Sequence, residues 1–246
     1  MDAARRRERA ASFGAAAAAY ARGRPPYPED AVDWLLPEGA RRVLDLGAGT
    51  GKLSALLCSR GLDVVAVEPS VEMLEQLTAA LPDVEARRGR AERIPLTDDS
   101  VDVVLVAQAW HWMDVDRAVP EVARVLRPRG RLGLVWNLRD ERRGWVAELG
   151  RLMHEAVEQG TDAYDPDVGA AFPRAERRDF PWEHVTTGAE IIDLVASRSY
   201  AITLPEARRR ELMAAVADLL GRNPDLRRRE TIAMPYVARC FRTTLR

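Results

Sequence analysis

Short runs of consecutive apolar residues alternate with amphipathic segments between residues 42 and 137. The run DVVAV at 63–67 is typical, because Ser70 then begins a stretch whose apolar residues recur at helical spacing. Strands without polar alternation are buried on both faces, which favours a parallel sheet covered by helices on both sides. The pattern predicts strands at 42–46, 63–67, 84–88, 101–106 and 131–136, and helices at 51–60, 70–80 and 116–126, the last ending near Pro128–Gly130.

The pattern is weaker on both sides of this region. Residues 3–19 are rich in alanine, the best helix former, so we expect a helix that Pro25 and Pro26 end. Arginines before the alanine run faintly imitate a secretion signal, but the apolar core of a signal is usually richer in leucine or valine. Further elements are expected as a short helix after Pro28, helices at 145–159, 190–197 and 206–220, a loop at 160–173, and strands at 180–185 and 231–242.

Composition and charge narrow the classes of partner. The 246 residues are 47% hydrophobic, which is enough to bury one substantial core. The formal net charge of -1 gives no overall field that favours nucleic acid or a membrane surface, and no apolar run reaches the roughly 18 residues of a membrane span. Residues 205–246 carry ten arginines and five acidic residues. We interpret this excess as a solvated surface, with a docking surface for an acidic partner or substrate as the alternative.

The cysteines indicate a reducing compartment. Cys58 and Cys240 lie far apart and have no spacing typical of metal ligands. Nothing suggests a disulfide framework, so we expect a cytoplasmic protein without a bound metal.

A glycine-rich segment, VLDLGAGTGKL at 43–53, joins the first predicted strand to the following helix. Gly47, Gly49 and Gly51 have no Cβ atom, so the chain can turn sharply and a ligand can touch the backbone. The helix that begins near Gly51 presents free N–H groups to a carboxylate or a phosphate. The segment is therefore predicted to be a ligand-binding loop.

The spacing of this loop excludes two common nucleotide-binding motifs. A dinucleotide fingerprint, GxGxxG, needs a third glycine at the position of Lys52, and a P-loop needs Gly-Lys-Ser/Thr after a gap of four residues. Asp45, just before the loop, would repel a pyrophosphate and attract an ammonium group. Glu68, at the end of the second strand, can accept hydrogen bonds from a ribose diol, or can simply favour the N-terminus of the next helix. The two carboxylates suit a ligand with an amine at one end and an adenosine at the other.

The motifs resemble those of class I S-adenosylmethionine-dependent methyltransferases, in the methyltransferase type 11 group that includes quinone-pathway methylases and trans-aconitate methyltransferase-like proteins. DLGAGTG resembles the first motif of this family and VEPS the second. The resemblance also includes GRAERIPLTDDSVDVVLVAQAWHW, ARVLRPRGRLGLVWN and the opening FGAAAAAYARGRPPYPEDAVDWL, which brings it to over half of the chain.

The resemblance implies an α/β fold of the Rossmann-like, doubly wound type. The expected sheet is mostly parallel and seven-stranded, with helices on both faces and an antiparallel last strand. We expect a single methyltransferase domain over residues 1–246. Its expected parts are an N-terminal helical cap at 1–40, a donor-binding core at 41–137, and an acceptor-side lid with the C-terminal strands at 138–246.

The implied cofactor is S-adenosylmethionine, which leaves as S-adenosylhomocysteine. By resemblance, Asp45 receives the amino group of the donor and Glu68 its ribose hydroxyls, while Arg24 pairs with its carboxylate. Met73 packs near the adenine or is simply a core residue, and Glu92 accepts from the adenine amine. The expected donor-binding residues are Tyr20, Arg24, Asp45, Gly47, Ala48, Gly49, Gly51, Glu68, Pro69, Met73, Ala91, Glu92, Gln108 and Ala109.

The candidate acceptor side is the Trp-His-Trp sequence after the fourth strand. His111 could remove a proton from the acceptor, or only orient the loop. Trp110 could face the sulfonium through its ring, or pack in the core. The expected substrate residues are Tyr27, Trp110, His111, Trp136, Asn137 and Tyr200, with Ser199 and Tyr236 as weaker candidates for which packing is the alternative.

The expected reaction is methyl transfer to oxygen or carbon of a small-molecule acceptor by in-line displacement. A nucleic acid acceptor is disfavoured, because AQAW at 107–110 is not the Asn/Asp-Pro-Pro-aromatic run of base amino-methylases. The alternatives are a catalytically silent S-adenosylmethionine-binding regulator and an NAD(P)-dependent oxidoreductase. The protein is expected to act as a monomer or a homodimer.

Overall fold

The structure is a computed structural model that describes residues 24–154, 165–198, 201 and 203–246. The predicted helix at 3–19, together with Tyr20, Ser199 and Tyr200, lies outside the described residues.

The chain divides into two compact units. The core unit consists of the described residues within Pro26–Asn137, Tyr164–Phe180 and Ala238–Arg246. The second unit consists of those within Met1–Pro25, Leu138–Ala163 and Pro181–Val237. The boundary after Asn137 coincides with the predicted end of the core at residue 137, and the single-domain organisation stays a prediction.

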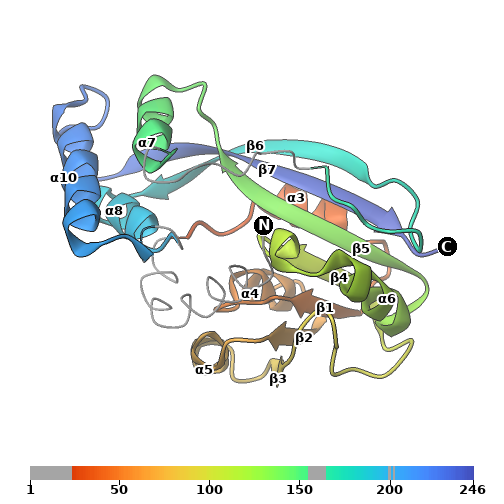
Figure 1. Ribbon diagram of the computed structural model, residues 1–246. Coiled ribbons are helices and arrows are strands. Elements are labelled where there is room, and N and C mark those ends of the chain that lie inside the picture. The colour runs from red at the N-terminus through yellow and green to blue at the C-terminus, as the bar shows by residue number, and fades with distance from the viewer. Residues whose placement is uncertain (1–23, 155–164, 199–200, 202) are drawn as a thin grey trace. The chain divides into compact units, whose positions relative to one another are not determined.

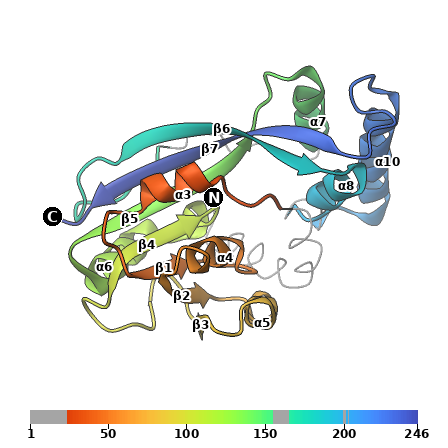
Figure 2. The same cartoon turned by 180° about the vertical axis from the view of Figure 1, so that it is seen from behind.

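A seven-stranded sheet has the strand order β3-β2-β1-β4-β5-β7-β6 (Figure 1). The pairs β1–β2, β1–β4, β2–β3 and β4–β5 are parallel, as the continuous apolar runs predict. Figure 2 shows β7 running against β6, which confirms the antiparallel last strand. The strands are β1 (Arg42–Leu46), β2 (Asp63–Glu68), β3 (Glu85–Arg88), β4 (Val101–Ala107), β5 (Leu126–Arg139), β6 (Glu176–Thr186) and β7 (Ile232–Thr244).

Helices cover both faces of the core unit's part of the sheet. Helix α6 lies in front of the strands in Figure 1, whereas α3 and α4 lie in front in Figure 2. Ser70 caps α5 as predicted, because its side chain accepts a hydrogen bond from the backbone N–H of Met73. The helices of this unit are α3 (Glu29–Leu35), α4 (Lys52–Cys58), α5 (Val71–Ala80) and α6 (Val115–Val125), with a 3₁₀ turn, η1 (Trp110–Trp112).

Strand β5 is longer than the predicted run at 131–136. It begins at Leu126, directly after α6, where Leu126 pairs with Val101. The next registered pair is Val103 with Arg131, so the residues between form a bulge inside the strand rather than a break before it. Arg129 has a φ of 65° in this bulge, and a Cβ on Gly130 would lie 2.8 Å from a backbone carbonyl. The prediction was wrong here because Pro and Gly also signal a bulge.

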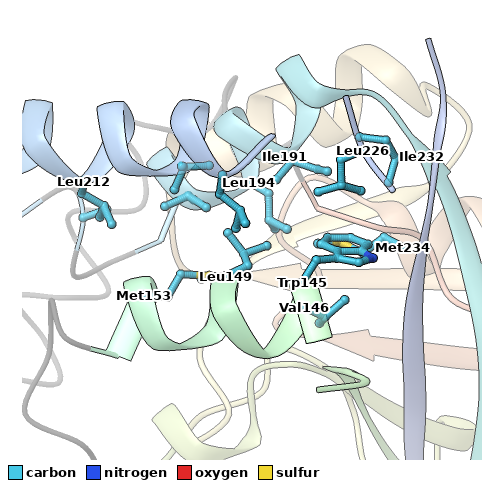
Figure 3. Packing of buried hydrophobic residues seen from close by; sticks show 14 of the residues in the cluster. Trp145, Val146, Leu149, Met153, Ile191, Leu194, Leu212, Leu226, Ile232 and Met234 are labelled. Carbon is cyan, nitrogen blue, oxygen red and sulfur yellow. The ribbon is translucent and has the colours of Figure 1, made fainter. Parts of the chain in front are cut away.

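The second unit has a hydrophobic core of its own (Figure 3). Side chains from α7 (Gly144–His154), α8 (Gly188–Ala196) and α10 (Glu206–Arg222) point toward one another. Leu149, Ile191, Val195 and Val216 are almost completely buried. No helix among the described residues is long and apolar enough to cross a membrane.

Candidate functional site

The glycine-rich loop after β1 is held against the end of β2. Gly47, Gly49 and Gly51 have φ values of 76°, 57° and 86°, in the left-handed region that favours glycine. The carbonyl oxygen of Val67 accepts hydrogen bonds from the backbone N–H groups of Gly47 at 2.8 Å and Ala48 at 3.2 Å. The loop therefore has one defined conformation at the carboxyl edge of the parallel strands.

Two of the glycines are also required by their neighbours. A Cβ on Gly47 would lie 2.9 Å from the Cβ of Ala109, and one on Gly51 would lie 2.9 Å from Leu77. Gly49 has more room, since its nearest neighbour would be the sulfur of Met73 at 3.9 Å. The glycine loop is thus placed between the end of β4 and helix α5, with the Met73 sulfur close to its centre.

Asp45 is completely buried at the end of β1, and half of its carboxylate is unsatisfied. Its Oδ2 accepts a 2.7 Å hydrogen bond from the hydroxyl of Ser54, whereas its Oδ1 is buried without a hydrogen-bond partner among the described residues. Burial raises its pKa from 3.8 to about 7, with a smaller contribution from the charge of Glu68, while Ser54 opposes the rise. A cationic ligand group would complete the bonding of Oδ1, which fits an ammonium.

Glu68, at the end of β2, joins the glycine loop to helix α5. Its Oε2 accepts from the backbone N–H of Gly49 and its Oε1 from that of Ser70, both at 2.9 Å. Burial raises the pKa of Glu68, and these two hydrogen bonds oppose the rise. Each oxygen retains a lone pair, so the carboxylate can also accept from two ligand hydroxyl groups.

The predicted adenine-side residues lie after β2 and β3. Pro69 is half-buried and Ala91 is buried. Glu92 accepts a 3.0 Å hydrogen bond from the backbone N–H of Asp114 through Oε1, so it also holds the segment before α6.

The end of β4 carries an unusual backbone conformation. Gln108 has a φ of 58°, which is uncommon for a residue other than glycine, and such conformations cluster at functional sites. Its side-chain amide donates to the carbonyl oxygen of Asn137 at 3.2 Å, and its backbone N–H donates to that of Val135 at 2.9 Å. The segment that carries Ala109 against Gly47 is therefore fixed to β5.

The aromatic residues after β4 are partly committed to internal contacts. The indole N–H of buried Trp110 donates to the carbonyl oxygen of Asp167 at 3.0 Å, which favours its packing role. The indole N–H of Trp136 donates to Nδ1 of His111 at 3.3 Å. His111 is exposed and lies beside Trp112, with ring centroids 4.6 Å apart. In its neutral form the imidazole then carries its proton on Nε2.

Asn137 connects the end of β5 to the segment before α3. Its side-chain amide donates to the carbonyl oxygen of Pro26 at 2.8 Å, directly before half-buried Tyr27. The amide thus fixes the chain on which Tyr27 stands. Arg24 and Tyr236, by contrast, belong to the second unit.

The structure brings the glycine loop, Asp45, Glu68, Gln108 and Ala109 together at neighbouring strand ends. Sequence reasoning missed Ser54, which holds Asp45, and Met113, whose methyl group would lie 3.5 Å from a Cβ on Gly47. A buried hydroxyl on the otherwise apolar face of α4 is a signal that could have indicated Ser54.

Comparison with known proteins identifies the family. Residues 44–134 match the model of the methyltransferase domain. An uncharacterized methyltransferase of Mycobacterium tuberculosis (strain ATCC 25618 / H37Rv) is 55% identical over 240 residues, which is 98% of each chain. This chain belongs to the methyltransferase family. An uncharacterized methyltransferase-like protein of Schizosaccharomyces pombe is 32% identical to this methyltransferase over 94% of each chain.

The fold of this methyltransferase also matches solved structures. A protein from Anaeromyxobacter dehalogenans, assigned as a type II methyltransferase, superimposes with a TM-score of 0.66 at 23% identity. The match covers 91% of this chain and 97% of the other. It supports the Rossmann-like class I fold expected from the sequence.

We predict that Gly47→Ala lowers both stability and donor affinity. An L-residue in the left-handed conformation costs about 1–2 kcal/mol, and the new Cβ also meets Ala109. Denaturant unfolding and titration with S-adenosylhomocysteine measure the two losses. Adding Ala109→Gly should relieve the contact but not the backbone strain, so complete recovery of stability in the double variant would contradict this account.

We also predict that affinity for S-adenosylhomocysteine falls as the pH drops below about 7. Asp45, with its pKa raised to about 7, is increasingly protonated there and loses its attraction for the ligand ammonium. Calorimetric titration should show about tenfold weaker binding at pH 6 than at pH 7.5. Asp45→Asn should bind weakly with little pH dependence; an unchanged slope in this variant would assign the proton to another group, Glu68 first.

Proposed function

We propose that this protein transfers the methyl group of S-adenosylmethionine to oxygen or carbon of a small-molecule acceptor. The observation that carries the proposal is the buried, half-satisfied carboxylate of Asp45 next to the left-handed glycine loop and Glu68. Together they offer one site for a cation and another for two hydroxyl groups, within the core unit. The donor has both features, and the family supports methyl transfer.

The core unit's residues would divide the donor among them. Asp45 would hold the ammonium, the backbone of the glycine loop the methionine part, and Glu68 the ribose hydroxyls. When bound, the donor supplies an electrophilic methyl group on a sulfonium, whose thioether is the leaving group. The protein contributes alignment, which can lower a barrier by about 7–11 kcal/mol. The adenine side would be formed by Pro69, Met73, Ala91 and Glu92, and the end near the methyl group by Gln108 and Ala109.

His111 is better placed to position the acceptor than to remove its proton. Its Nδ1 lone pair already accepts from Trp136, so in the neutral ring Nε2 carries the proton and is a donor rather than a base. Such a donor could orient an acceptor oxygen. A carbon or oxygen acceptor that is already ionised would need no base from the protein.

Of the two alternatives, only the oxidoreductase fits the structure less well. An NAD(P)-dependent oxidoreductase would place a pyrophosphate near the buried carboxylate of Asp45. This chain also has Lys52 where the dinucleotide fingerprint needs its third glycine. A silent donor-binding regulator shares the donor site and differs only in the absence of turnover. Absence of nucleic acid partners, a monomeric or homodimeric state and a cytoplasmic location stay predictions.

The first test is calorimetric titration with S-adenosylhomocysteine and, separately, with NADH. We expect the thioether nucleoside to bind and NADH not to bind. Glu68→Ala should weaken this binding by about 1–3 kcal/mol, the scale of hydrogen bonds to a charged group. Binding of NADH alone would overturn the proposal, and unchanged affinity in Glu68→Ala would place the ribose elsewhere.

The second test concerns His111 and uses methyl release from the donor over a panel of phenols, quinols and carboxylic acids. His111→Ala should lower turnover and leave affinity for S-adenosylhomocysteine unchanged. Because we assign a positioning role, His111→Gln, which retains an N–H donor, should recover part of the turnover without a new pH dependence. Full loss in both variants, with an altered pH profile, would instead favour proton removal by His111. Absence of release with every acceptor would favour the regulator.

A further inference from the structure

Tyr236 on β7 buries a hydroxyl group that nothing in the described structure satisfies. The residue is 2% exposed, and its hydroxyl oxygen has no hydrogen-bond partner among the described residues. Its ring stacks on Trp182 of β6, with centroids 5.6 Å apart and an interplanar angle of 27°. The ring is therefore held in place while the hydroxyl lacks a partner.

An unsatisfied buried hydroxyl is costly and uncommon. Burial without a partner typically costs about 1–3 kcal/mol, and most buried side-chain polar atoms have at least one partner. A phenylalanine would keep the stack on Trp182 without this cost. The hydroxyl of Tyr236 thus indicates a partner that is not among the described residues, such as a bound ligand.

Positive charge surrounds this hydroxyl. The backbone N–H of Asp140 donates to the carbonyl oxygen of Pro235 at 2.9 Å, which aligns Arg139 at the end of β5 with Tyr236. The Nε of Arg139 is buried without a hydrogen-bond partner among the described residues, and Glu141 is 3.6 Å from its guanidinium. Arg198, just beyond α8, and Arg24 also act electrostatically on Tyr236. All of these residues belong to the second unit.

The protonation state of Tyr236 makes it a donor. Burial raises the pKa of the hydroxyl, and the charges of Arg198, Arg139 and Arg24 oppose the rise. The phenol is therefore neutral near pH 7, with its O–H available to an acceptor atom. A phenol O–H and a guanidinium N–H that both lack acceptors are complementary to an anion, above all to a carboxylate.

We propose that Tyr236 and Arg139, with the charges of Arg198 and Arg24, form a binding site in the second unit for a carboxylate of the methyl acceptor. The inference rests on the proposed methyl transfer, and it narrows the acceptor to a small carboxylic acid. The hydroxyl is closed to solvent in this conformation, so ligand entry requires a local opening of the second unit.

The acceptor is favoured over the donor as the source of the carboxylate. The buried carboxylates and the glycine loop that suit the donor all lie in the core unit, at residues 45–109. The unsatisfied hydroxyl of Tyr236 and Nε of Arg139 lie in the other unit. The carboxylate of the donor, for which Arg24 is the expected partner, is the competing source.

The experiment is a titration of the full chain, with and without S-adenosylhomocysteine, by matched pairs of small molecules. The probes are succinate and benzoate, each compared with its neutral amide. We expect each carboxylate to bind at least about tenfold more tightly than its amide. Tyr236→Phe, which keeps the stack on Trp182, and Arg139→Gln should each remove this preference. Arg143→Gln is the matched control, because its guanidinium is exposed in the same unit and should leave the preference intact.

Each other outcome has a defined meaning. The proposal is overturned if carboxylates bind no better than amides, or if their preference survives Tyr236→Phe. It is also overturned if Tyr236→Phe weakens S-adenosylhomocysteine instead, since the site then belongs to the donor. Circular dichroism and thermal unfolding check that the variants fold, and two independent variants keep the result interpretable. If carboxylates bind more tightly than amides but S-adenosylhomocysteine does not bind, the anion site is supported and the proposed methyl transfer is contradicted.

Discussion

The burial of Asp45 with only one of its two oxygens bonded is the constraint on which the site depends. A carboxyl group whose pKa rises from 3.8 to about 7 costs on the order of 4 kcal/mol of folding free energy above pH 7. Because the folded pKa is raised, stability falls as the pH increases from about 4 to about 7 and then stays at the lower value. The protein tolerates this cost, and a ligand ammonium group would remove much of it. The electrostatic penalty in the free protein and the affinity for a cation have the same origin.

The surrounding structure keeps Asp45 from relaxing. Ser54 fixes one oxygen from helix α4, while the other is buried without a hydrogen-bond partner among the described residues, on a strand that β2 and β4 flank. Glu68 then ties the glycine loop to α5 through two backbone N–H groups. A glycine-rich loop loses much conformational entropy when it is held in one conformation. Hydrogen bonds from Gly47 and Ala48 to Val67 offset that entropy, so the loop is pre-organised before a ligand arrives.

The core strands and the donor-side carboxylates were predictable, because their signals are local. A run of apolar residues indicates a buried parallel strand. Glycines directly after such a run, with a carboxylate beside them, indicate a ligand-binding loop at the end of the strand. The bulge at 127–130 was not predictable in this way. It depends on Leu126 pairing with Val101 and on the carbonyl oxygen of Gly130 accepting from the backbone N–H of Leu245, which is distant in sequence.

Tertiary contacts also decided which candidate side chains remain available. Nothing in the Trp-His-Trp sequence indicates that Trp110 donates to Asp167, or that Trp136 donates to His111. The same holds for Asn137, whose amide is used by Pro26. Residue type can suggest that a side chain is capable of chemistry. Only the contacts show whether its donor or acceptor is already used within the fold.

Each of the two units buries polar groups without partners among the described residues, and the two sets call for ligand groups of opposite charge. The core unit buries a carboxylate oxygen that lacks a donor, whereas the second unit buries a phenol hydroxyl and a guanidinium Nε that lack acceptors among the described residues. A neutral ligand would leave the charge at either site without a counter-charge from the ligand. Each site should therefore bind a ligand of the opposite charge more tightly than a neutral ligand of the same shape. A zwitterionic donor could satisfy Asp45, but its single carboxylate does not require a separate set of buried groups in the other unit. The second set is better explained by a second ligand, and in a methyltransferase that ligand is the acceptor.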